Sequence, residues 1–143
     1  MKTFFLILFV TVVFTLAGPA SAETNGWGLG VGSFDGEFGA QARKDLRLGG
    51  DVSHITLQGS VIFANRTTFA IDADYHFVIK SGKGRFYPLA GLNFAFNSDD
   101  TEFGVNGGGG LNFMFTDKLG GFAEVKYVFF GWEGWFITGG VYF

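Results

Sequence analysis

Apolar and polar residues alternate with a period of two along most of this chain, and this alternation constrains the fold more than any other feature. Asp72, Asp74 and His76, for example, are separated by single apolar residues within the stretch 69–79. Successive side chains of a β-strand point to opposite faces of a sheet. Such a stretch therefore has one apolar face and one polar face. The same alternation recurs up to the C-terminus, and it predicts an all-β protein without a helix after the first 22 residues.

Turn-forming residues divide the alternating region into eight segments. The turns are expected at residues 35–36, 49–51, 65–66, 81–84, 98–100, 117–118 and 131–132. Each segment has about the 9–11 residues that a tilted strand needs to cross a bilayer, or somewhat more. Strands joined by tight turns pair as antiparallel neighbours. We therefore expect an eight-stranded antiparallel up-and-down β-barrel.

Residues 1–22 have the features of a secretory signal peptide. A lysine precedes an apolar run at residues 4–16, and the small residues Ala20 and Ala22 stand where a signal peptidase reads the chain. The apolar run is too short to span a membrane as a helix. We therefore expect cleavage after Ala22 and a single barrel domain at residues 23–143.

The composition excludes several classes of protein. Only 16% of the residues are charged and the net charge is −3, which gives no indication of a nucleic-acid partner. The chain has no cysteine, so it can form neither a disulfide framework nor a thiolate metal site. It also has no second long apolar run, which excludes a helical membrane protein. We expect no cofactor and no metal.

Parity alone does not say which face of the sheet points into the barrel. A soluble lipocalin-like barrel would hold the apolar face inside, and a membrane barrel would hold it outside. The apolar parity carries roughly thirty large side chains, whereas the interior of an eight-stranded barrel is just filled by side chains or holds one small ligand. We therefore expect the phenylalanines to face lipid and a transmembrane barrel, whose closed sheet satisfies its backbone in hydrocarbon.

The polar parity predicts a network of charges inside this barrel. Its expected members are Arg43, Asp45, Arg47, Asp72, Asp74, His76, Arg85, Glu124 and Lys126. Unpaired buried charges are costly, so we expect these groups to pair and to leave no open pore. Lys44 is the one mid-strand charge on the apolar parity, and either snorkelling or a β-bulge would explain it.

The second half of the mature chain resembles a known family. The stretches "FYPLAGLNFAFNSDDTEFGVNGGGGLNF", "TDKLGGFAEVKYVF" and "GGVYF" are similar to small outer-membrane β-barrel proteins of Gram-negative-type bacteria. These are the porin-like and opacity-like relatives of the transmembrane domain of outer membrane protein A. The resemblance implies an outer-membrane location among outer-membrane lipids. It also implies transient contact with periplasmic chaperones and the barrel-assembly machinery, and we expect a monomer.

In that family a terminal aromatic residue, with an apolar residue two positions before it, is the recognition signal for the assembly machinery. Phe143 and Val141 match this signal. Thr138 departs from the pattern, because the family has a glycine there and this chain has its glycines one and two positions later. The resemblance thus assigns Val141 and Phe143 to assembly.

Three functions stay open at this point. The expected one is a non-enzymatic outer-membrane barrel of structural or interaction type, without catalytic residues. The second is a lipid-modifying barrel enzyme that uses His76, for which Ser60 is the one well-placed luminal serine and no convincing nucleophile is found. The third is a soluble lipocalin-like lipid carrier.

With the N-terminus in the periplasm, the outward-facing loops would be those at 35–36, 65–66, 98–101 and 131–132. These loops are too short for a large adhesive or receptor surface. The carboxylates of Asp99, Asp100 and Glu102 are interpreted as a polar loop, because the calcium-binding EF-hand pattern is absent.

Overall fold

The computed structural model describes residues 26–48, 52–82 and 84–143. Ala20 and Ala22, the predicted cleavage site, lie outside these residues, and so does the rest of the predicted signal peptide. The described residues form nine strands: β1 (Trp27–Phe34), β2 (Glu37–Arg47), β3 (Ser53–Phe63), β4 (Thr67–Phe77), β5 (Ile79–Ser81), β6 (Gly84–Phe96), β7 (Thr101–Met114), β8 (Gly120–Phe129) and β9 (Gly134–Tyr142). Within these ranges there is no helix long and apolar enough to cross a membrane.

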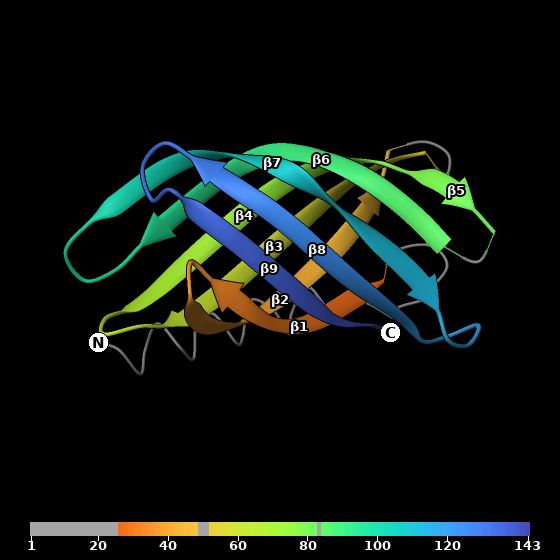
Figure 1. Cartoon of the computed structure of the whole chain (residues 1–143), viewed down its shortest axis with the longest axis horizontal. Coiled ribbons are helices and arrows are strands. Elements are labelled where there is room, and N and C mark those ends of the chain that lie inside the picture. Colours follow the sequence, from red (N-terminus) through yellow and green to blue (C-terminus); the bar gives the residue numbers. More distant parts are fainter. Residues whose placement is uncertain (1–25, 49–51, 83) are drawn as a thin grey trace.

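The strands close into a barrel in which each pairs antiparallel with its neighbours. β1 pairs with β2 on one side and with β9 on the other, so the first and last strands complete the sheet. Two backbone hydrogen bonds extend this last pairing to the C-terminus, from Trp27 N to Phe143 O (3.2 Å) and from Phe143 N to Trp27 O (2.9 Å). The strands are strongly tilted, with the turns at 97–100 and 130–133 towards the left end of Figure 1.

β4 and β5 are two parts of one barrel strand, so the barrel has eight strands as predicted. β4 pairs with β6 up to Leu89, and β5 resumes the same register from Phe86. Pro88 lies in the gap between these pairings. Because proline has no backbone N–H, it cannot donate to the ladder there. The interruption is therefore local and does not shift the register.

Apolar side chains cover the outside of the barrel, and this confirms the predicted orientation of the two faces. Leu29, Val125 and Ile137, for example, are 50%, 43% and 55% exposed, whereas the charged side chains of Arg43 and Lys126 are buried. A lipid carrier of the lipocalin type needs the reverse arrangement.

The prediction that phenylalanines do not fit the lumen is wrong for three of them. Phe34, Phe122 and Phe136 are buried inside the barrel. Glycines on neighbouring strands provide the room. A Cβ atom at Gly39 would lie 2.6 Å from the ring of Phe34, and one at Gly140 would lie 2.7 Å from the ring of Phe122. The inward glycines therefore make space for aromatic rings as well as for charges.

Lys44 lies on the outer face without a bulge. It pairs in register with Trp27 of β1, and the ladder between β1 and β2 is continuous. Its Nζ atom lies 4.8 Å from the centroid of the Trp27 ring. This geometry contradicts the bulge and fits the snorkelling explanation, with a cation–π contact close to one end of the barrel.

Candidate functional site

The middle of the lumen is crossed by an ion pair between Arg43 of β2 and Glu124 of β8. Arg43 Nη1 donates to Glu124 Oε2 and Nη2 donates to Oε1, both at 2.9 Å. This fork geometry is the strong form of an arginine–carboxylate contact. Arg43 Nη2 also donates to Gln58 Oε1 (2.7 Å), and Tyr87 OH donates to Glu124 Oε2 (2.9 Å). Because β1 and β9 lie between β2 and β8 in the sheet, the pair spans the lumen between strands that are not neighbours.

A second group of charges surrounds Lys126 of β8. Its Nζ atom lies 2.8 Å from Asp74 Oδ2 and 3.1 Å from Asp72 Oδ1. Asn106 Nδ2 donates to Oδ1 of both aspartates at 2.7 Å, and Asn93 Nδ2 donates to Asp72 at 2.8 Å. The two carboxylates therefore share one cation and the Asn106 amide, and Asp72 accepts from a second amide, that of Asn93. We call Arg43, Glu124, Lys126, Asp72 and Asp74 the charged layer.

His76 packs beside the charged layer and is only 1% exposed. Its ring stacks on that of Tyr87 with a centroid distance of 4.2 Å. Thr56 Oγ1 donates to Asp45 Oδ1 (2.7 Å) and lies 3.3 Å from His76 Nδ1. With its proton given to Asp45, Thr56 Oγ1 is an acceptor for His76 in the Nδ1–H tautomer. The imidazole is thus held inside the barrel, between the ring of Tyr87 and the hydroxyl of Thr56.

Next to the charged layer, towards the turns at 35–36 and 130–133, the lumen is filled by apolar side chains. We call this cluster the apolar plug: Phe34, Ile62, Ala70, Ala95, Val128 and Phe136. The rings of Phe34 and Phe136 lie 4.9 Å apart, and the half-buried Trp132 packs edge-on against Phe136 at 5.6 Å. The plug lies between the charged layer and this end of the barrel.

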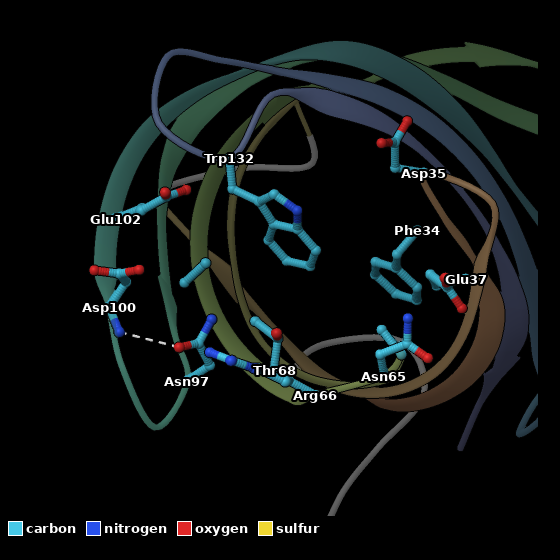
Figure 2. A pocket seen from close by; sticks show the side chains of 12 residues that line it. Phe34, Asp35, Glu37, Asn65, Arg66, Thr68, Asn97, Asp100, Glu102 and Trp132 are labelled. Carbon is cyan, nitrogen blue, oxygen red and sulfur yellow. Dashed lines mark hydrogen bonds between the residues drawn. The ribbon is translucent and has the colours of Figure 1, made fainter.

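Outside the plug, the barrel opens into a pocket with a volume of about 360 Å³, which we call the mouth cavity. Figure 2 shows the rings of Trp132 and Phe34 near its centre, with carboxylates on both sides. Asn97 Oδ1 orders one edge by accepting from the backbone N–H groups of Asp99 and Asp100. The cavity is lined by Phe34, Asp35, Glu37, Ala64, Asn65, Arg66, Thr68, Ala95, Asn97, Asp100, Glu102 and Trp132.

Comparison with known proteins identifies solved structures that have the same architecture as this chain. The chain matches no protein-family model and no curated protein sequence. Among solved structures, the N-terminal β-barrel domain of OprF from Pseudomonas aeruginosa matches with a TM-score of 0.67 and 21% identity, over 83% of this chain and 95% of that chain. The chain has the fold of a small outer-membrane barrel. Ail, the attachment invasion locus protein of Yersinia pestis, matches with a TM-score of 0.52 and 12% identity over the same shares.

Within this fold the structure brings together most of the residues predicted for the luminal network. Thr56 links Asp45 to His76, and His76 Nε2 lies 4.0 Å from Glu124 Oε2 of the charged layer. Arg47 and Arg85, in contrast, are only half-buried, at the end of β2 and near the start of β6. They were expected among Asp72, Asp74 and Glu124, but those carboxylates are paired by Arg43 and Lys126.

Sequence reasoning did not single out Tyr87, Gln58, Tyr142 or the mouth cavity. The alternation of polar and apolar residues could have identified Tyr87, Gln58 and Tyr142, because each has the inward parity of its strand and is buried. The mouth cavity has no comparable signal, since its residues come from several turns and strand ends that only the closed barrel brings together. Val141 and Phe143 lie on the outer face, 40% and 46% exposed.

Proposed function

We propose that this protein is an integral outer-membrane β-barrel of structural or interaction type, with a closed lumen and no enzymatic activity. The observation that carries the proposal is the exposed apolar surface around a barrel whose charges are buried inside. Soluble monomers rarely expose contiguous apolar patches larger than a few hundred Å², and a bilayer covers such a band. The fold shared with the barrel of OprF and with Ail supports the same location.

The contents of the lumen support a barrel without an open pore. Arg43 and Glu124 join two non-neighbouring strands across the lumen, and the apolar plug fills the lumen next to them. In a barrel of eight strands the interior is just wide enough to be filled by its side chains. Two successive obstacles of different chemistry would therefore have to move before ions could pass.

The surroundings of His76 support a non-enzymatic role. A catalytic histidine has to reach the proton that it abstracts or donates. His76 is instead stacked on Tyr87 and held by Thr56 inside the barrel. Expression of the wild type and of a His76→Ala variant should therefore leave the masses of lipid A and phospholipids equal. A mass change that depends on His76 would contradict the proposal.

The principal test combines location with conductance. The protein should fractionate with outer membranes, run faster on gels before heating than after it, and give no stable conductance steps in planar bilayers. A spin label at position 125 should report lipid, while one at position 126 should report a buried polar site, because Val125 faces outward and Lys126 inward. A water-soluble protein, or a reversed pattern of the two labels, would overturn the proposal.

We also propose that Val141 and Phe143 act in assembly more than in stability. Both side chains face outward, and the contribution of Phe143 to barrel closure is made by its backbone. A Phe143→Asp variant keeps these backbone hydrogen bonds, so it should refold in vitro with nearly unchanged stability. In cells it should accumulate in the periplasm and be degraded. Normal insertion in vivo would contradict the assembly role.

A further inference from the structure

The mouth cavity combines three features of a ligand site in one place. It is closed at its base by the apolar plug, it has aromatic rings near its centre, and it has charged groups at its edges. Its volume of about 360 Å³ lies within the range of small-molecule sites, roughly 300–1,000 Å³. We propose that the mouth cavity binds a small organic cation, an ammonium or guanidinium group carried on a short apolar stem.

The sign of the charge follows from the lining. Asp35 and Glu37 lie on one side of the cavity and Asp100 and Glu102 on the other (Figure 2). The cationic side chain that lines the cavity, Arg66, forms an ion pair with Asp99. The positive charge of Arg66 is therefore compensated, and a cationic ligand meets a lining that is negative on both sides.

The spacing of the carboxylates favours an organic cation over a metal ion. Among the described residues, no three Asp, Glu or His side chains come together as the ligands of one metal ion would. An organic cation can meet carboxylates on opposite sides one at a time, while its stem contacts the rings.

Trp132 adds a reason that does not depend on the carboxylates. Tryptophan is the aromatic side chain with the strongest attraction for cations placed over its face, within about 6 Å of the ring centroid. Trp132 is held at the cavity by its edge-on contact with Phe136 in the plug. An ammonium or guanidinium group in the cavity therefore meets both an aromatic ring and a negative rim, and the apolar stem can rest on Phe34.

A titration of the purified full barrel in a neutral detergent tests this inference. The probe is N-acetylarginine methylamide, and the neutral comparison compound is the citrulline analogue of the same shape. The indole N–H resonance of Trp132 is the reporter, and the indoles of Trp27 and Trp135 serve as internal controls outside the cavity. The arginine probe should shift the Trp132 resonance and bind at least about tenfold more tightly than the citrulline compound. This preference should fall as salt is raised, because exposed charges are screened.

Matched variants sharpen the test. Glu102→Gln should weaken binding several-fold, and the double variant Glu37→Gln/Glu102→Gln should weaken it by about tenfold or more. Glu133→Gln is the control, because Glu133 is exposed beside Trp132 but does not line the cavity. Gel migration before heating verifies that each variant is folded. Equal binding of the citrulline compound, or equal effects of Glu102→Gln and Glu133→Gln, would overturn the proposal.

The same titration with a tri-arginine peptide distinguishes two sources of the cation. If the natural ligand is a basic peptide segment, the peptide should bind much more tightly than the single arginine compound. If it is a small free cation, the two should bind with similar affinity per cationic group. A failure of binding in both arms refutes the inference and leaves the membrane location and closed lumen untouched.

Discussion

The charged layer and the apolar plug occupy the same lumen and are carried by the same strands, but different forces hold them together. β8 contributes Glu124 and Lys126 to the charged layer and Val128, the next inward residue, to the plug. In the charged layer each group depends on a particular partner. In the plug, side chains need only fill the available space. The comparison shows that the environment of an inward-facing residue in a small barrel depends on its depth along the barrel axis as much as on its parity.

This difference predicts two kinds of response to mutation. A charged layer fails when one partner is removed, because the remaining buried charge has no compensation. An apolar plug loses stability in proportion to the volume removed. Equilibrium unfolding in phospholipid vesicles with urea or guanidinium measures this contrast.

The largest effect is expected at Lys126. Lys126→Met removes the cation that Asp72 and Asp74 share, and it should lower the free energy of unfolding by about 3–5 kcal/mol. Lys118→Met is the matched control, because Lys118 is exposed in the turn before β8, and a surface change of this kind should stay within about 0.5 kcal/mol.

A compensating variant separates charge from packing at the same position. Lys126→Met combined with Asp74→Asn removes one buried carboxylate together with the cation. It should recover part of the lost stability. If the double variant were less stable than Lys126→Met by the full cost of a second independent mutation, the two groups would not be coupled.

The next largest effect is expected one residue earlier, on the opposite face. Val125 faces outward in the middle of β8. Val125→Lys places a charge in hydrocarbon near the centre of the bilayer, so it should cost about 2–4 kcal/mol. Val125→Leu, which keeps the face apolar, is the control. An equal, small effect of both variants would mean that this face does not contact lipid.

The strands, their order and the direction of their faces could be predicted from the sequence, because the turns order the strands, parity separates the two faces, and side-chain volume decides which face points inward. The alternation of Asp72, Asp74 and His76 with apolar residues separates the two faces, and the large apolar side chains are too many for an eight-stranded lumen. The depth of each inward-facing residue along the barrel axis could not be predicted in the same way. Phe34 and Phe136 have the inward parity of their strands, but only the register and tilt of the closed sheet place their rings together in a plug.

The same limit applies to the site residues. Asp74 and Lys126 could be assigned to one lumen, but their pairing depends on the register around the barrel. Arg85 was expected in the network because parity does not distinguish a strand end from its middle. The mouth cavity depends on turns that meet only after closure, so Trp132 and Glu37 gave no joint signal in the sequence.

A smaller effect is expected at Tyr87, which tests a hydrogen bond to the charged layer without removing a charge. Tyr87→Phe deletes the hydroxyl that donates to Glu124 Oε2 and keeps the ring that stacks on His76. Hydrogen bonds to charged groups contribute about 1.5–3 kcal/mol, so stability should fall by this amount. Tyr127→Phe on the outer face is the control. A neutral Tyr87→Phe variant would show that Arg43 alone satisfies Glu124.

The smallest effect is expected in the plug. Ile62 is completely buried there, and Ile62→Val removes a single methylene group whose space no neighbour can fill without moving. Such a change typically costs about 0.5–1.5 kcal/mol. Ile71→Val is the matched control on the outer face, where Ile71 is 52% exposed and a flexible lipid chain fills the space that the methylene group leaves. It should change the free energy of unfolding by less than about 0.5 kcal/mol. If both variants lost the same stability, the plug would be no more tightly packed than the lipid around the barrel, and its role in closing the lumen would have to be given up.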